Sequence, residues 1–264
     1  MSAANPETVL ITGASSGIGL ELAKCFAADG CRVILVARSK EALETLAEEL
    51  LRKNKAEAIV LTADLSLLET PKLIFEELSA QNISVDILVN NAGFGLHDAF
   101  VTLPLQRQLE MIRVNVTALT ELTGLFLPGM IERQRGGILN VGSVAGFQPG
   151  PGMTVYYATK AYVLSFTEAL AEELSDAGLI VTALCPGPTT TNFGNVARGQ
   201  KTRKIKTQKM AAEAVAIYGH RAFRKGKRLA VPGLSNRLLI FMNRITPRWF
   251  PRKIIKFYNR TKTV

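Results

Sequence analysis

Short apolar segments alternate with helix-like segments along the first two-thirds of the chain. The apolar segments predict strands at residues 8–12, 33–37, 58–62, 87–90, 138–141, 180–184 and 228–231. The periodic segments predict helices at residues 18–28, 42–51, 71–78, about 105–131, 157–174 and 211–223. Strands that are apolar throughout are typical of a parallel sheet covered on both faces. With right-handed crossovers, the pattern predicts an α/β fold with a doubly wound parallel sheet.

The length of the chain favours a single domain followed by a tail. Its 264 residues fit one large α/β domain, which we place at residues 1–232. Residues 187–208 are rich in Thr, Gly, Asn and Lys and break the alternation, so we expect a substrate lid at about residues 187–210. Residues 233–264 form a basic, aromatic C-terminal extension.

The composition argues against a disulfide framework, a metal site and a membrane span. The three cysteines match no zinc spacing and predict free thiols in a reducing compartment, and the two histidines are too few for a His-rich metal site. The N-terminus lacks the pattern of a secretory signal, and no apolar run reaches roughly 18 uninterrupted residues. We expect a cytoplasmic protein, which the basic tail could also bring to a membrane surface as a peripheral protein.

Charge is distributed unevenly along the chain. Residues 198–264 carry 19 lysines and arginines and one acidic residue, whereas residues 1–197 carry 13 basic and 21 acidic residues. This asymmetry favours either contact with an anionic surface or a solvated basic helix. No nucleic-acid-binding module is recognisable, so we expect no nucleic-acid partner.

A glycine-rich turn follows the first predicted strand and opens the first predicted helix. Gly13 allows the tight turn, Gly17 lets the backbone approach a pyrophosphate, and Gly19 lets the helix pack closely on the sheet. The helix N-terminus then presents free N–H groups to an anion. No Gly-Lys-Ser/Thr follows, which excludes a Walker loop. We expect the cofactor to contact Gly13, Ser15, Ser16, Gly17, Ile18 and Gly19.

Arg38 ends the second predicted strand. An acidic residue there would bind the ribose 2′-hydroxyl of NAD, whereas a basic residue accommodates the 2′-phosphate of NADP. No Asp or Glu lies between Gly30 and Lys40. We therefore expect NADP(H) to be preferred over NAD(H).

An ordered set of motifs extends over residues 7–232. They are the turn at Gly13 to Gly19, Asp64-Leu65, Asn90-Asn91-Ala92-Gly93, Asn115, Ser143, Tyr156-x-x-x-Lys160 and Pro186-Gly187. In this set the chain resembles the classical short-chain dehydrogenases/reductases. The resemblance implies a Rossmann-like fold that binds NAD(P)(H), and an oligomer, either a homodimer or a homotetramer, formed through the two long helices.

The resemblance also implies roles for individual residues. Asp64 would receive the adenine amino group, and Leu65 would supply a backbone contact. The segment Asn91, Ala92 and Gly93 would line the adenosine-ribose side of the cleft. The predicted contacts at the nicotinamide end are Pro186, Gly187, Thr189 and Thr191, where Thr189 and Pro188 depart from the usual family pattern.

Tyr156 and Lys160 are four residues apart on a predicted helix, so their side chains fall on one face. A phenol has a reference pKa of about 10, and a neighbouring ammonium favours the phenolate. We therefore expect Lys160 to lower the pKa of Tyr156 and make it a general acid or base. Tyr157 points elsewhere and has no lysine four residues on, so we expect it to pack.

Ser143 and Asn115 complete the predicted catalytic set. The Ser143 hydroxyl would hydrogen-bond the substrate oxygen beside Tyr156, and by resemblance Asn115 would hold a water that relays protons with Lys160. The aromatic and thioether side chains near this set either line an apolar pocket or pack. They are Phe94, Phe147, Met153 and Phe193.

The C-terminal extension mixes aromatic and aliphatic residues with basic ones. It would lie on an anionic membrane surface, fold over the substrate cleft or form an oligomer contact. The sequence predicts an NADP(H)-dependent oxidoreductase for a small lipophilic carbonyl or alcohol substrate of steroid, retinoid or 3-oxoacyl type. The alternative is a nucleotide-binding regulatory or membrane-surface protein with little turnover.

Overall fold

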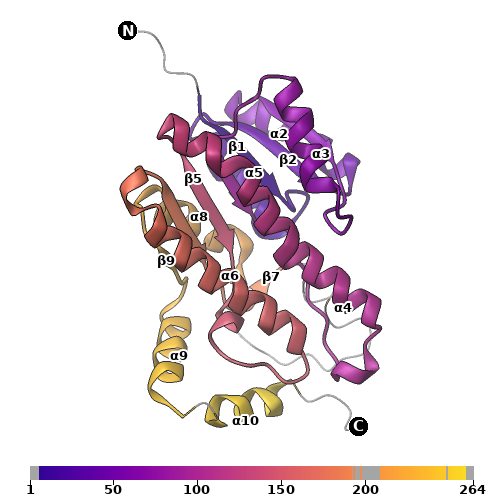
Figure 1. Cartoon of the computed structure of the whole chain (residues 1–264), viewed down its shortest axis with the longest axis vertical. Helices are drawn as coiled ribbons and strands as arrows, with labels where there is room; N and C mark the ends of the chain where they lie inside the picture. The colour runs from indigo at the N-terminus through magenta and orange to yellow at the C-terminus, as the bar shows by residue number, and fades with distance from the viewer. Residues whose placement is uncertain (1–5, 192, 194–196, 198–208, 248, 260–264) are drawn as a thin grey trace.

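A computed structural model describes residues 6–191, 193, 197, 209–247 and 249–259 (Figure 1). Within this part of the chain, a parallel sheet has the strand order β3-β2-β1-β4-β5-β6-β9. Its strands are β1 Thr8–Thr12, β2 Arg32–Ala37, β3 Ala58–Thr62, β4 Ile87–Asn90, β5 Gly137–Val141, β6 Ile180–Leu184 and β9 Leu229–Ala230. The order reverses between β1 and β4, which confirms the doubly wound α/β fold.

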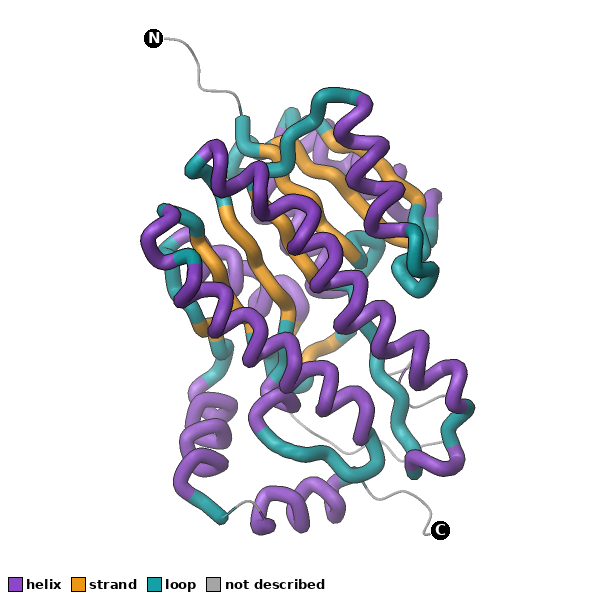
Figure 2. The backbone as a smooth tube through the Cα atoms, in the orientation of Figure 1, coloured by secondary structure: helices purple, strands orange, loops and turns teal. Residues whose placement is uncertain are grey.

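Helices cover both faces of this sheet (Figure 2). The domain helices are α1 Gly17–Ala28, α2 Lys40–Asn54, α3 Thr70–Ala80, α4 Leu105–Ile112, α5 Ala118–Arg133, α6 Thr154–Glu173 and α8 Ala212–Arg224. The short elements are η1 Phe100–Thr102, η2 Arg113–Thr117, η3 Val144–Phe147, η4 Ser175–Ala177, β7 Thr189–Thr190 and β8 Met210–Ala211. The predicted elements are all present, with ends that differ by a few residues.

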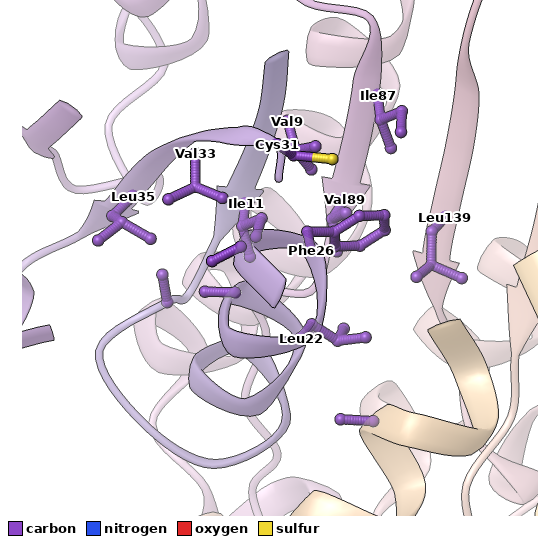
Figure 3. Close-up of a cluster of buried hydrophobic side chains, with 14 of the residues drawn as sticks. Val9, Ile11, Leu22, Phe26, Cys31, Val33, Leu35, Ile87, Val89 and Leu139 are labelled. Carbon is purple, nitrogen blue, oxygen red and sulfur yellow. The ribbon is translucent and has the colours of Figure 1, made fainter. Parts of the chain in front are cut away.

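Alternation along the strands divides the core into two layers. Val9 and Ile11 of β1 face the cluster formed with α1, α2 and α8, part of which Figure 3 shows. Leu10, between them, faces the cluster formed with α3, α5 and α6. Both layers need apolar partners, because successive side chains of a strand point to opposite faces. This explains why the strands are apolar throughout instead of alternating with polar residues.

The predicted long helix contains a π-helical turn, η2, between α4 and α5. The combined helix Leu105–Arg133 is long and apolar enough, by length and average composition, to cross a membrane. It is not an uninterrupted apolar run, because Glu110 and Arg113 lie within it. Its residues Leu122 and Phe126 pack in the core beneath α3 and the sheet. We therefore interpret it as a core helix of the domain.

The described part of the C-terminal extension forms two helices, α9 Leu234–Ile245 and α10 Trp249–Tyr258. Figure 1 shows them at the lower end of the molecule, beyond β9 and α6. At the two ends of the predicted lid, strands β7 and β8 pair with each other in parallel. Residues 192, 194–196 and 198–208 of that prediction lie outside the described residues.

Candidate active site

The turn between β1 and α1 has the backbone conformation that its glycines permit. Gly13 and Gly17 adopt φ values of +66° and +60°, which L side chains rarely adopt. A Cβ on Gly19 would lie 2.4 Å from the Gly13 carbonyl oxygen, so this glycine lets α1 pack against the turn. Ser16, at the N-cap of α1, makes no side-chain capping bond, and the first turn has no acidic residue. The helix N-terminus therefore fits an anion such as a pyrophosphate; Ser15 and Ile18 lie half-buried beside it.

Thr12 connects this turn to the residues that follow β4. Its hydroxyl accepts hydrogen bonds from the backbone N–H groups of Asn91 and Ala92, each at 3.0 Å. The Asn91 amide donates to the carbonyl oxygens of Thr12 and Gly13 at 2.9 and 3.2 Å. These hydrogen bonds hold the glycine-rich turn next to the Asn91-Ala92 segment, the two being far apart in sequence and both predicted to contact the cofactor. Thr12 was missed as a site residue, although its position at the head of the turn was a usable signal.

Arg38 and Asp64 follow the paired strands β2 and β3, where the adenosine end of a dinucleotide would lie. The Arg38 side chain is exposed, and the Asp64 carboxylate accepts a hydrogen bond from the Ser66 N–H at 2.9 Å. Burial raises the pKa of Asp64, but Ser66 and the nearby charges of Arg38 and Arg107 bring it below its ordinary value overall. An ionised carboxylate and a guanidinium therefore lie at this end; Leu65, next to Asp64, is buried.

Tyr156 and Lys160 lie at the start of α6 and are both buried. The Lys160 Nζ donates a hydrogen bond to the Val141 carbonyl oxygen at 2.8 Å, which holds it beneath the end of β5. Ser143, just after β5, forms a side-chain hydrogen bond with Tyr156. The structure thus brings together three of the four predicted catalytic residues around the first turn of one helix.

Asn115, the fourth, lies in the π-helical turn η2 and is 1% exposed. Its Nδ2 donates to the Phe94 carbonyl oxygen at 3.0 Å and to the Thr159 Oγ1 at 3.1 Å, and its Oδ1 accepts from the Phe94 N–H at 3.1 Å. Asn115 and Lys160 both lie next to Gly93. A Cβ on this glycine would be 3.0 Å from Asn115 Oδ1 and 3.6 Å from Lys160 Nζ. Thr159 is therefore a further candidate site residue, which the sequence analysis did not predict.

The protonation of this site differs from the sequence prediction. Burial raises the pKa of Tyr156 to about 12, and the opposing influence that lowers it is the hydrogen bond with Ser143. Burial lowers the pKa of Lys160 to about 8. The expectation that Lys160 lowers the pKa of Tyr156 is therefore wrong for this arrangement, because loss of solvent around the phenol is the largest influence on that pKa and raises it. Tyr156 is protonated at neutral pH.

The loop after β6 lies against the opposite side of the site. The Pro186 carbonyl oxygen accepts a hydrogen bond from the Val144 N–H at 3.0 Å, and the Thr189 hydroxyl donates to the Gly187 carbonyl oxygen at 3.0 Å. A Cβ on Gly17 would lie 3.0 Å from Thr191 Cγ2. The structure thus places Thr191 beside the predicted pyrophosphate turn, whereas the resemblance had placed it toward the nicotinamide end.

Apolar side chains surround the Tyr156 ring. The Phe193 ring centroid lies 5.3 Å from that of Tyr156, and Met153 belongs to the same cluster. A Cβ on Gly95 would lie within 3.2 Å of all three side chains, so glycine at this position lets them pack close to the backbone. Phe147 packs instead with the cluster around Cys185 and Val231. The side chains around Tyr156 are therefore mainly apolar.

These features define a nicotinamide-dependent type of site: a phosphate-binding turn, a buried Tyr–Lys pair and a serine at the end of a central strand. Residues 7–202 match the family model described as short chain dehydrogenase. The chain belongs to this family of oxidoreductases, as the resemblance predicts.

Relatives and solved structures agree with this assignment. The very-long-chain 3-oxoacyl-CoA reductase of Anas platyrhynchos is 35% identical over 195 residues, which cover 72% of the chain and 62% of the relative. The chain thus spans about three-fifths of that protein's length. The reductase of the same name from Rattus norvegicus is 30% identical over 259 residues, covering 97% and 80%. A short-chain dehydrogenase from Sphingobium yanoikuyae in complex with NADPH superposes with a TM-score of 0.81 at 34% identity, covering 90% and 93%.

Proposed function

We propose that the protein reduces a lipophilic ketone of 3-oxoacyl type to the alcohol with NADPH. The observation that carries this proposal is a buried Tyr156, hydrogen-bonded to Ser143 and bordered by Phe193 and Met153. Asn115, Ser143, Tyr156 and Lys160 form the proposed catalytic set, and residues 1–232 the proposed catalytic domain.

NADPH, when bound, supplies the hydride that reduces the carbonyl carbon. The reaction also needs a proton on the carbonyl oxygen, and the Tyr156 phenol is the proposed donor. With a pKa of about 12 the phenol holds its proton throughout the neutral range, which favours reduction over alcohol oxidation. The Ser143 hydroxyl holds the substrate oxygen beside it. Lys160, held by the Val141 carbonyl oxygen, is mostly protonated below its pKa of about 8.

The preference for NADP(H) over NAD(H) rests on Arg38. Its exposed guanidinium at the end of β2 is free to form charge-assisted hydrogen bonds to a 2′-phosphate. The NADPH named in the Sphingobium yanoikuyae structure supports the same choice.

The names of the relatives support the substrate class. Those from Anas platyrhynchos and Rattus norvegicus are very-long-chain 3-oxoacyl-CoA reductases, whose name describes a long apolar chain beside a ketone. A homodimer or homotetramer remains part of the proposal.

A steady-state assay of NADPH oxidation tests the proposal. Ketones with the same 3-oxo group and progressively longer alkyl chains are compared, and kcat/KM is expected to rise with chain length. Small polar ketones that are reduced as fast as long-chain ones would contradict the lipophilic substrate class.

Arg38→Gln tests the cofactor preference separately. Removing the guanidinium is expected to reduce the ratio of kcat/KM for NADPH to that for NADH at least tenfold, since a hydrogen bond to a charged group contributes about 1.5–3 kcal/mol. Arg52→Gln, at an exposed position on α2, serves as the control and should leave the ratio unchanged.

A further inference from the structure

Both C-terminal helices expose rows of apolar side chains, which we call the apolar stripe. Leu234, Leu238, Phe241 and Ile245 recur at helical spacing on α9, and the last three are 61%, 58% and 61% exposed. On α10 the exposed apolar residues are Trp249, Phe250, Ile254 and Phe257. Soluble domains rarely expose so many large side chains together, and such patches mark interaction surfaces.

Positive charge borders this stripe. The exposed side chains beside it include Arg244 on α9 and Arg252, Lys253 and Lys256 on α10. The chain has no acidic residue after Glu213. A symmetric contact between two copies of this surface would bring like charges together. An anionic lipid surface instead complements both the charges and the apolar stripe.

The inner faces of the same helices are attached to the candidate active site. Ile240 packs against the cluster containing Phe147, and the Asn243 amide donates to the Gln148 side-chain oxygen. Asn236 lies so close to Gly187 that a Cβ on this glycine would be 2.5 Å away. The orientation of α9 is therefore fixed relative to the loops that follow β5 and β6.

The end of α10 is attached in the same way. Asn259 donates to the Pro151 carbonyl oxygen at 2.9 Å and forms a side-chain hydrogen bond with Tyr157, next to Tyr156. Its contacts reach the loop that leads into α6. Both tail helices thus face the domain on one side and expose apolar residues on the other.

A second apolar segment lies at the same end of the molecule. Phe100 and Val101 of η1 and Leu105 of α4 are exposed, and Figure 1 shows α4 reaching the lower end of the view, where α9 and α10 lie. This end contains the carboxyl ends of the strands, where the candidate site is built. Two separate segments of the chain therefore expose apolar residues at this end of the molecule.

We propose that α9 and α10, together with residues 100–105, dock on an anionic lipid bilayer and hold the active-site end of the domain against it. Bilayer contact through Trp249 and the phenylalanines fits the preference of aromatic side chains for the membrane interface. The lysines and arginines add electrostatic attraction, which salt screens. A lipophilic substrate would then reach the site from the bilayer.

Trp249 is the only tryptophan of the chain, so its fluorescence reports on docking directly. The full chain is mixed with vesicles of phosphatidylcholine alone, or of phosphatidylcholine and phosphatidylglycerol in equal parts. We expect a blue shift and quenching by brominated acyl chains with the anionic vesicles, both weakened by salt. No emission change and no co-sedimentation with anionic vesicles would overturn the proposal.

A double variant locates the surface. Phe241→Glu with Phe257→Glu is expected to weaken vesicle binding at least tenfold. The control, Leu67→Glu with Leu73→Glu, alters side chains of similar exposure, 62% and 58%, near and on α3. Equal loss in both variants would overturn the assignment of the surface.

Two further readouts complete the test. Thermal unfolding shows whether the variants are folded without relying on catalysis, so loss of docking is distinguished from failure of the proposed function. Self-association of the wild type without lipid, abolished by Phe241→Glu with Phe257→Glu, would show that a second copy covers this surface and would overturn the bilayer proposal.

Discussion

Lys160 is buried with its Nζ on the Val141 carbonyl oxygen, and this burial makes its contribution to stability depend on pH. Its pKa falls from 10.5 to about 8 on folding, so between these values the unfolded chain binds more protons than the folded chain. Stability from this residue is therefore present at high pH and is lost as pH falls through about 8.

We expect the free energy of unfolding of the wild type, relative to Lys160→Met, to rise by up to about 3 kcal/mol as pH increases through this window. Urea unfolding of both proteins at neutral and alkaline pH measures the difference. A difference that stays constant would show that Lys160 keeps an ordinary pKa in the folded chain.

Gly93 leaves room for the side chains of Asn115 and Lys160, and a methyl group would intrude on them. We expect Gly93→Ala to lower kcat at least tenfold while the protein still folds, because a Cβ there lies 3.0 Å from Asn115 Oδ1. The control is Gly124→Ala on α5, where a Cβ meets no atom within 4 Å. This control should keep full activity and gain about 0.5–1 kcal/mol of stability. Equal activity in the two variants would contradict the placement of Asn115.

At the scale of elements, one face of α6 serves two purposes. Thr159 accepts a hydrogen bond from Asn115 at 3.1 Å, and two turns later Thr167 accepts one from Asn140 at 2.9 Å. The first bond positions a catalytic candidate, whereas the second belongs to a buried polar network between the helix and β5. Such networks stabilise a fold only when their members are paired.

The two threonines should therefore respond differently to the same substitution. Thr159→Val is expected to lower kcat about tenfold with little change in KM, and Thr159→Ser should restore it. Thr167→Val should leave kcat near the wild-type value and lower the stability by about 1–3 kcal/mol. Steady-state kinetics and urea unfolding of the three variants give both quantities. Loss of kcat in Thr167→Val alone would reverse these roles.

The elements differ in how far the sequence could predict them. Strands β1 and β4 were predicted within their observed bounds, because runs such as those around Ile11 and Val89 are apolar on both faces. The π-helical turn at Asn115 was not predicted, since a shift of backbone hydrogen bonds from i+4 to i+5 leaves no clear mark on side-chain spacing. For the extension, the sequence predicted a basic, aromatic segment but not its two helices, α9 and α10, which are separated at Pro247.

The site shows a similar division. Spacing alone identified Tyr156 and Lys160 as neighbours on one helix face, and the structure confirms that both lie on α6. Spacing could not predict their protonation, because burial decides the pKa of each group and depends on residues from other elements. Thr159 was missed for the same reason, since its partner Asn115 lies 44 positions away.

At the scale of the whole molecule, the chain combines an α/β domain, whose first 197 residues carry more acidic than basic side chains, with a basic helical extension. The domain supplies the dinucleotide turn and the buried Tyr156, and the extension packs against the loops at the active-site end. The proposed reductase activity and the proposed bilayer contact are separable, because Tyr156 lies in the domain and the docking residues are exposed on α9, α10 and residues 100–105. Each can fail while the other holds.

The central claim is that Tyr156 donates the proton to a lipophilic ketone. It is tested most directly by kcat/KM for NADPH-dependent reduction in Tyr156→Phe and Tyr157→Phe, which remove the same hydroxyl from adjacent positions. We predict a decrease of about 10²–10⁴-fold for Tyr156→Phe with the affinity for NADPH retained, as expected for loss of a general acid. Tyr157→Phe should stay within a few-fold of the wild type. A Tyr156→Phe protein that reduces the ketone at the wild-type rate would contradict the account.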